Sequence, residues 1–244
     1  MIRRTQSADI DTSRANYDRI YEQGSSRLSN EGLIGIRYRL PKTFSLLQER
    51  YRHSGPLEIL EIGAGVGEVA QMLLNSELHV QRYVGMEYSL PAVRHMHAKG
   101  FDCAHMSAEH LAFPDNSFDL VFCFDVMHHV ANPRWMASEI VRVTRKHFFL
   151  SEANGVSPVR KLGELNQLAR SLGEQSYFPW TYRSFFPRDQ VSYIELRPFY
   201  VLVPPSTPES LIPFVVKSSE FGERVAGLRW IGQSVLIAGE KRQS

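Results

Sequence analysis

The chain has 244 residues, enough for one sizeable domain with a small appended lobe, and its hydrophobic fraction of 43% and charged fraction of 22% are ordinary for a globular protein. Its formal net charge of +2 at pH 7 is too small to favour nucleic acid or an anionic membrane as a partner. The basic start, MIRRTQSADIDTS, is followed by no apolar segment, so we expect no signal peptide, and no apolar run is long enough to span a bilayer.

The N-terminal part of the chain is predicted to be helical. Residues 1–30 are polar, and Ala15, Tyr17 and Ile20 have helical spacing. A Gly-Ser-Ser loop follows at residues 24–26, and the proline at the start of Pro41–Tyr51 indicates a second helix there. We therefore expect residues 1–54 to form a helical cap.

From residue 57 to residue 151, predicted strands alternate with predicted helices. The strands are Leu57–Ile62, His79–Glu87, Phe101–Met106, Phe118–Val126 and His147–Ser151, and the helices are Glu68–Leu74, Pro91–Lys99 and Pro133–Arg145. Alternation over about 100 residues predicts an α/β fold with a doubly wound parallel sheet.

The alternation ends after residue 152. We expect a helix over Val159–Leu172 and the aromatic-rich loop SYFPWTYRSFFP within residues 153–190, which we interpret as a lid insert. Two late strands, Tyr193–Val203 and Arg229–Ala238, are predicted within residues 191–244, where they would complete the sheet.

The stretch LEILEIGAGVGEVA, residues 57–70, carries the first chemical signal. A strand that runs into three glycines and then a helix lets a ligand approach the main chain, where we expect unpaired amides. Dinucleotide-binding enzymes share this arrangement, but their spacing needs a third glycine at position 68, where this chain has Glu68. Glu61 and Glu68 border the loop, and two like charges ~4 Å apart cost about 4 kcal/mol at a partly exposed site, which disfavours a diphosphate there. A ligand with an ammonium group, such as S-adenosylmethionine (SAM), suits these acids better.

A further acid, Glu87, ends the predicted strand His79–Glu87, 20 residues after Gly67. In a doubly wound sheet this strand lies beside the first one, so its terminal carboxylate can accept hydrogen bonds from both hydroxyl groups of a ribose. That position suits SAM and NAD equally, and it does not discriminate between them.

Three motifs follow one another within residues 55–152: EIGAGVG, GMEYS and MSAEHLAFPDNSFDLVFCFDVMHHV. In this combination and order they resemble the class I SAM-dependent methyltransferases, in the broad small-molecule branch. The resemblance implies a Rossmann-like methyltransferase fold with a mostly parallel seven-stranded sheet, an N-terminal helical segment and a lid insert before the sixth strand. It also implies SAM as the methyl donor and S-adenosylhomocysteine as the product.

The resemblance further implies that the methionine moiety lies along the glycine loop, the ribose at Glu87 and the adenine near Tyr88 and Ala108. The full set of implied cofactor contacts is Glu61, Gly63, Ala64, Gly65, Gly67, Glu87, Tyr88, Ser107, Ala108, Glu109, Phe124 and His129, with Tyr17 and Tyr21 on an N-terminal helix that closes over the cofactor. The family usually has Asp at the position of Ser107. Either Glu109 takes over that role or cofactor affinity is lowered, because a neutral hydrogen bond is roughly half as strong.

Methyl transfer from a sulfonium is an in-line displacement, and it needs a general base only if the acceptor must lose a proton. His128 and His129 are the candidates, because they follow the strand Phe118–Val126 at the carboxyl edge of the sheet, where ligands bind in this architecture. The resembling family carries this pair whatever its acceptor, so at least one of the two has a structural or cofactor-side role. Asp125 is expected to cap or orient a neighbour.

The aromatic residues of the lid insert are candidates for the acceptor pocket. We predict that Phe178, Trp180 and Tyr182 bind an apolar or aromatic acceptor, with Phe185 and Phe186 beside them. The alternative is that these rings form the insert's own small core.

The sequence therefore favours a SAM-dependent methyltransferase that acts on a small-molecule acceptor through an O, N or C nucleophile. Alternatives are an RNA- or protein-directed methyltransferase, a SAM-binding regulator without turnover and a nicotinamide oxidoreductase. The two cysteines, Cys103 and Cys123, are far apart, and no His, Cys and Asp cluster has metal-ligand spacing, so we expect neither a disulfide framework nor a metal, and a cytoplasmic location. Nucleic acid and membrane partners are not favoured, and the oligomeric state is not predicted.

Overall fold

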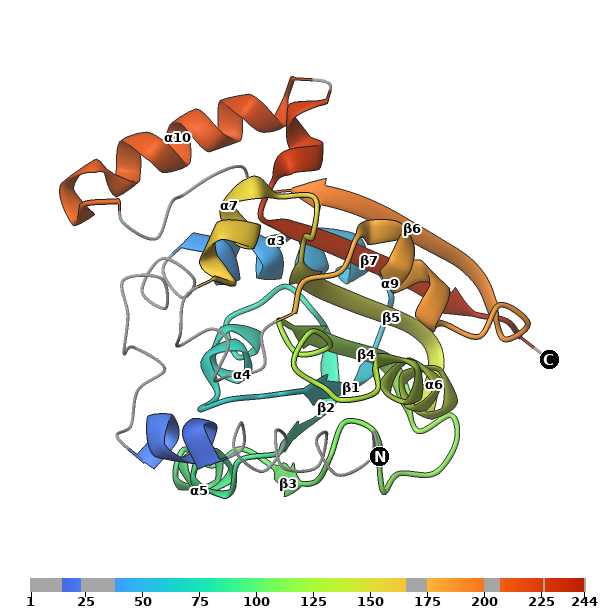
Figure 1. Ribbon diagram of the computed structural model, residues 1–244. Helices are drawn as coiled ribbons and strands as arrows, with labels where there is room; N and C mark the ends of the chain where they lie inside the picture. The colour runs from blue at the N-terminus through green and yellow to red at the C-terminus, as the bar shows by residue number, and fades with distance from the viewer. Residues whose placement is uncertain (1–14, 23–37, 166–174, 200–206, 226, 244) are drawn as a thin grey trace, which may run out of the picture.

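The computed structural model describes residues 15–22, 38–165, 175–199, 207–225 and 227–243. They contain one seven-stranded sheet with the order β3-β2-β1-β4-β5-β7-β6 (Figure 1). The strands are β1 (Leu57–Ile62), β2 (Val80–Glu87), β3 (Cys103–His105), β4 (Phe118–Phe124), β5 (Thr144–Ala153), β6 (Val191–Phe199) and β7 (Ser234–Lys241). Neighbouring strands are parallel except at β7, which runs antiparallel to both β5 and β6. The predicted doubly wound, mostly parallel sheet is confirmed.

Helices cover both faces of this sheet. They are residues 15–22, α3 (Leu40–Tyr51), α4 (Glu68–Leu73), α5 (Leu90–Ala98), α6 (Pro133–Val143), α7 (Pro158–Gly163), α9 (Pro179–Phe185) and α10 (Ile212–Glu223), with 3-10 turns η2 (Glu209–Leu211) and η3 (Leu228–Ile231). Successive β4 side chains alternate between two cores: Val121 and Cys123 pack with α6 and α9, whereas Leu120 and Phe122 pack with α3 and α4. A strand buried on both faces has no polar side, which explains why β4 reads as a continuous apolar run.

The predicted elements from residue 57 to residue 151 all exist, with ends that differ by a few residues. The late elements differ more. Residues 229–231, predicted to begin a strand, belong to η3, and β7 begins only at Ser234. Residues 179–185, predicted as loop, form α9 with Pro179 in its first turn, a position where the missing amide of proline costs nothing. The predicted helix Val159–Leu172 and strand Tyr193–Val203 extend partly outside the described residues.

The fold brings the ends of β1, β2 and β4 to one edge. Ile62 pairs with Met86 of β2 on one side and with Cys123 of β4 on the other, so the glycine loop, Glu87 and Phe124 leave the sheet together. The chain winds outward from β1 through β2 to β3 and from β4 to β5 in the opposite direction. In doubly wound folds, ligands bind in a crevice at the carboxyl edge where the winding reverses, and in this sheet that point lies between β1 and β4. Within the described residues, none of the helices combines the length and apolar character needed to cross a membrane.

Candidate functional site

The loop between β1 and α4 needs its glycines. Gly63, Gly65 and Gly67 have φ values of 74°, 55° and 89°, a region that other residues rarely adopt. A Cβ at Gly63 would lie 2.4 Å from Cγ2 of Val126, and one at Gly67 would lie 2.6 Å from Sδ of Met96. The loop therefore fits closely between the start of the β4–α6 connection and α5, and a side chain at either end would displace it.

The amides of this loop are bonded within the protein, contrary to the expectation that they are unpaired. The N–H groups of Gly63 and Ala64 donate to the carbonyl oxygen of Met86 at 2.8 and 3.0 Å. The N–H of Gly65 donates to Oε2 of Glu87 at 2.9 Å. These three donors are therefore not available to a phosphate, which weakens the case for a dinucleotide further.

Two buried carboxylates flank the loop. Glu87, 8% exposed, also accepts hydrogen bonds from the N–H groups of Tyr88 and Ser89 at 2.7 and 3.1 Å. Glu61, 3% exposed, accepts from the hydroxyl of Tyr83. Burial raises the pKa of Glu61 to about 8, against the opposing effect of the Tyr83 hydrogen bond, and burial also raises the pKa of Glu87. Neither carboxylate forms an ion pair with a described residue, so each favours a cationic or hydrogen-bond-donating ligand.

Of the residues predicted around the adenine, Tyr88 directly follows β2, and Ser107, Ala108 and Glu109 lie along the β3–β4 connection. Ala108 is buried, and the hydroxyl of Ser107 accepts a hydrogen bond from the N–H of Glu109 at 3.2 Å. One carboxylate oxygen of Glu109 accepts from the N–H of Asn132, just before α6. The Glu109 carboxylate is thus tied to the loop that opens α6 through this oxygen.

The helix formed by residues 15–22 spans the crevice. On one side, Ser89 donates to Asp18 at 2.6 Å, and Nε2 of His95 lies 3.0 Å from the carbonyl oxygen of Tyr21. On the other side, the hydroxyl of Tyr17 lies 3.1 Å from the ring nitrogens of His129. Between them, the Tyr21 hydroxyl lies 3.5 Å from a Cβ placed at Gly65. In Figure 1 this dark blue helix lies beside α5, as these contacts require.

Asp125 follows β4 in an unusual conformation. Its φ is 58°, in the left-handed region, where Asp is tolerated better than most residues. Its N–H donates to the carbonyl oxygen of Ser151 at 2.7 Å, and its Oδ2 pairs with the guanidinium of Arg39 at 2.6 Å. Its Oδ1 is buried and has no hydrogen-bond partner among the described residues. A strained residue with an unsatisfied oxygen, at the edge where ligands bind, marks a candidate ligand contact.

The aromatic residues of the insert divide into two groups. Tyr182 is fully buried, and its hydroxyl donates to the carbonyl oxygen of Ala153 at 2.8 Å. Phe185 is partly buried against the same core, and Phe186 stacks on Phe148 with ring centroids 4.8 Å apart. These three rings pack in the core, which favours the alternative interpretation for them, and the role of Tyr182 at the acceptor stays a prediction.

Phe178 and Trp180 are 45% and 59% exposed and stack on each other with centroids 4.9 Å apart. Both stand at the start of α9, Phe178 as the residue that precedes the helix. Among the described aromatic residues of the insert, these two are the exposed ones and are accessible to a ligand.

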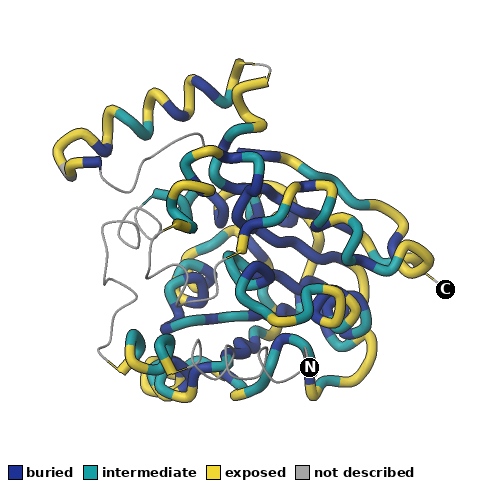
Figure 2. The backbone as a smooth tube through the Cα atoms, in the orientation of Figure 1, coloured by how far each residue is buried: buried dark blue, intermediate teal, exposed yellow. Residues whose placement is uncertain are grey.

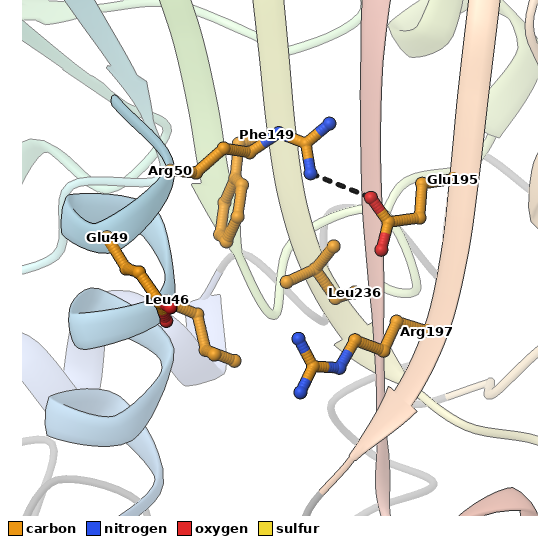
Figure 3. A pocket seen from close by; sticks show the side chains of 7 residues that line it. All are labelled: Leu46, Glu49, Arg50, Phe149, Glu195, Arg197 and Leu236. Atoms are coloured by element: carbon orange, nitrogen blue, oxygen red, sulfur yellow. Dashed lines mark hydrogen bonds and ion pairs between the residues drawn. The ribbon is translucent and has the colours of Figure 1, made fainter. Parts of the chain in front are cut away.

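A separate pocket of about 260 Å³ lies between α3 and the sheet (Figure 3). An ion pair of 2.7 Å between Arg50 and Glu195 crosses it. Its lining is Leu46, Glu49, Arg50, Phe149, Glu195, Arg197 and Leu236. No residue predicted for the cofactor or the acceptor lines it, so it is distinct from the crevice at the carboxyl edge.

Residues 60–150 match the protein family described as "Methyltransferase domain". The chain is 33% identical over 94 residues to an uncharacterized methyltransferase of Mycolicibacterium gilvum, covering 36% of this chain and 35% of that protein. It is 32% identical over 95 residues to the uncharacterized methyltransferase YcgJ of Bacillus subtilis, covering 36% of each. Over residues 60–150, the chain is therefore similar to class I SAM-dependent methyltransferases. It spans about a third of the length of these curated relatives.

Solved structures agree with this fold. The structure of Bacillus subtilis YcgJ superposes with a TM-score of 0.59 at 21% identity, covering 83% of this chain and 99% of YcgJ. A putative methyltransferase of Haloferax volcanii, described in a complex with the Trm112 methyltransferase activator, gives a TM-score of 0.66 at 16% identity, covering 93% and 98%. At these identities the likeness establishes the fold alone.

The residues at this edge of the sheet fit SAM chemically. SAM brings a cationic sulfonium, an ammonium group and two ribose hydroxyls, and it carries no phosphate. The site offers buried Glu61 and Glu87, which lack basic partners among the described residues, and a loop whose amides at Gly63, Ala64 and Gly65 are already bonded. Among the described residues, no group of three His, Cys, Asp or Glu side chains could hold a metal ion.

The two adjacent histidines, His128 and His129, have different surroundings. His128 is 2% exposed, its Nδ1 lies 2.7 Å from Oε2 of Glu152, and its Nε2 lies 3.3 Å from the guanidinium of Arg160. Because a guanidinium only donates, Nε2 must be the accepting nitrogen, and Nδ1 then carries the hydrogen. Burial and the nearby Arg160 lower the pKa of His128 to about 3. His128 is thus a neutral, fully engaged ring, unsuited to act as a base, whereas His129 is only half-buried and contacts Tyr17.

Sequence reasoning missed Glu152 and Arg160. Glu152 is fully buried at the end of β5 and also accepts from the N–H groups of Val126 and Met127 at 3.1 and 2.8 Å, so it organises the turn after β4. Its position directly after the predicted strand His147–Ser151 was the available signal. Arg160 comes from α7 in the insert, and nothing in its local sequence indicates that it reaches His128.

Proposed function

We propose that this protein transfers the methyl group of SAM to a small-molecule acceptor. In this proposal Glu61 and the loop of residues 63–67 hold the methionine end, and Glu87 accepts hydrogen bonds from the ribose hydroxyls. Tyr88, Ser107, Ala108 and Glu109 surround the adenine, and Phe124 lies near the methionyl carbons. The observation that carries the proposal is the pair of buried carboxylates beside a glycine loop in which the amides of Gly63, Ala64 and Gly65 are already bonded.

The helix of residues 15–22 supports a small acceptor. It touches α5 through His95, the glycine loop through Tyr21 and the turn after β4 through His129, so it covers the crevice from both sides. A covered site excludes water and admits compact substrates more easily than a long polymer. The exposed pair Phe178 and Trp180 would offer an apolar or aromatic contact to such an acceptor.

SAM supplies an activated methyl group, so the protein mainly aligns the acceptor and excludes water. We assign the base, where the acceptor must lose a proton, to His129, because both ring nitrogens of His128 are engaged. Oδ1 of Asp125 accepts a hydrogen bond from the N–H or O–H of the acceptor, which would satisfy that buried oxygen. His128 and Glu152 hold the turn that carries both residues.

Two other functions stay open. The Haloferax volcanii protein is described with an activator protein, which leaves a macromolecular acceptor, RNA or protein, as the second candidate. A SAM-binding regulator without turnover is the third, and the replacement of the family Asp by Ser107 is the feature that favours it.

Methyl transfer with labelled SAM tests the proposal directly. The purified chain would be offered small apolar and aromatic alcohols, phenols and amines, and in parallel total RNA and a protein extract, and S-adenosylhomocysteine would be quantified. We expect product with small acceptors alone. Label that enters only RNA or protein would support the second candidate, and tight SAM binding without transfer to any acceptor would support the third.

A further inference from the structure

Six large apolar side chains are exposed within one short segment, from η2 through α10 to η3. The two most exposed are Phe214 at 71% and Phe221 at 69%, both on α10. The full set is Leu211, Phe214, Phe221, Val225, Leu228 and Trp230, with exposed fractions between 40% and 71%. We call this set the α10 ridge. Contiguous exposed apolar surface of this kind marks an interaction site.

Phe214 and Phe221 of the ridge lie on the outer side of α10, and the inner side of this helix packs against the rest of the protein. Ile212, Ser219 and Gly222 are buried, and Val215 and Val216 pack against the core that includes α3. Glu223 pairs with Lys42 of α3 at 2.5 Å, which anchors the end of α10. Figure 1 shows α10 projecting beyond the sheet, and Figure 2 shows exposed residues along it. The side chains of the ridge therefore do not contribute to the hydrophobic core and stay exposed.

Four exposed apolar residues in α10 and directly beside it form a line along the helix. Phe214 and Phe221 are seven residues apart, and Leu211 and Val225 extend the same line at spacings of three and four. At 3.6 residues per turn these positions stack on one face of the helix. The two phenyl rings stand roughly 10 Å apart along the axis, since each residue adds about 1.5 Å.

Basic side chains border this line. Lys217 is three residues after Phe214 and four before Phe221, and Arg224 is three residues after Phe221, so both neighbour the rings on one flank. Arg229 of η3 is exposed beside Trp230. None of the three basic residues forms an ion pair with a described residue. Exposed Glu220 lies beyond the basic flank, away from the apolar line.

We propose that the α10 ridge docks on an anionic lipid surface, with the rings and Trp230 in the interface and the basic residues at the headgroups. Apolar aromatic residues bordered by lysine and arginine on a projecting helix are what a flat, negatively charged bilayer accommodates. A second copy fits less well, because an antiparallel pairing about Ser218 brings the Lys217 and Arg224 flanks of the two copies together. The inference concerns a surface away from the crevice and does not depend on the acceptor.

Vesicle sedimentation of the purified full chain tests the inference. Vesicles of phosphatidylcholine alone are compared with vesicles in which phosphatidylglycerol makes up about one third of the lipid. We expect the full chain to bind the acidic vesicles. Phe214→Ser/Phe221→Ser should lower the affinity for these vesicles about tenfold or more, because the two rings would be buried in the lipid and carry the apolar part of the contact. Lys217→Gln/Arg224→Gln should lose the preference for acidic lipid.

The matched control is Leu74→Ser/Leu162→Ser, which removes two leucines that are 67% and 68% exposed elsewhere on the molecule. It should bind vesicles like the wild type, and all variants should keep the wild-type melting temperature because the side chains are exposed. A lack of binding to acidic vesicles would overturn the inference, as would an equal loss in the control. A dimer in light scattering that Phe214→Ser/Phe221→Ser dissolves would assign the ridge to a second copy instead.

Discussion

The raised pKa of Glu61 predicts that SAM affinity rises with pH. With a pKa of about 8 in the cofactor-free site, Glu61 is almost fully protonated at pH 6. An ammonium group beside it favours the ionised form, so binding expels a proton. Ionising Glu61 at pH 6 costs about 2 × 1.36, or roughly 2.7 kcal/mol, which corresponds to about 100-fold in affinity. Because half of Glu61 is still protonated at pH 8, we expect the dissociation constant for SAM to fall about 50-fold between pH 6 and pH 8.

Titration calorimetry in two buffers of different ionisation enthalpy measures this proton release. At pH 7, one unit below the pKa, about 0.9 proton should leave per SAM bound. Glu61→Gln should remove that release and most of the pH dependence, with any remaining slope due to Glu87, whose pKa is also raised. Glu68→Gln is the control. Glu68 raises the pKa of Glu61 through its charge, and burial is the larger cause, so this variant should still release a proton on binding SAM. Equal affinity at pH 6 and pH 8 with no proton release would refute the reasoning.

The same pKa has a consequence for the cofactor-free protein. A carboxyl whose folded pKa is raised stabilises the fold fully below its unfolded pKa of about 4.5, and that contribution is lost as the pH rises through about 8. Cofactor-free Glu61→Gln should therefore have a larger free energy of unfolding than the wild type at pH 8, by a few kcal/mol at most, and about the same one at pH 4. Urea unfolding at the two pH values measures the difference.

Three further outcomes follow from the site. Glu87→Ala should weaken SAM binding by about 1.5–3 kcal/mol in calorimetry, the usual value of hydrogen bonds to a charged group, and an unchanged affinity would show that the ribose lies elsewhere. The pKa of His128 is lowered to about 3, so the wild type loses stability as the pH falls below about 6.5. In urea unfolding, His128→Asn should therefore reduce the change in the free energy of unfolding with pH. His129→Ala should lower the turnover number and leave unfolding unchanged. Trp180→Ala should reduce kcat/KM about tenfold at unchanged SAM affinity, since one aromatic contact is worth roughly 1–2 kcal/mol. Tyr182→Ala should instead lower the free energy of unfolding by about 3–5 kcal/mol. The reverse pattern would place Tyr182 in the acceptor pocket.

The sequence by itself determined the sheet and the cofactor class. Alternating apolar strands and helices predict a parallel sheet because each strand must be buried on both faces, and β1 was predicted with the ends that the structure shows. The glycines and acids around residues 61–67 are local in the chain, so their chemistry is readable from order alone. That local pattern also matched the known family over the core.

Tertiary structure decided which of these groups are free to act. The loop amides look available in the sequence, but β2 supplies the acceptors that bond them, Met86 and Glu87. His128 and His129 are equivalent candidates for a base in the sequence, yet in the structure Glu152 and Arg160 from later elements contact the two ring nitrogens of His128. A net charge of +2 averages over the whole surface and does not reveal that Lys217, Arg224 and Arg229 lie beside exposed apolar side chains. Exposure, pairing and pKa depend on neighbours that are distant in the chain, and no local pattern in a single sequence encodes them.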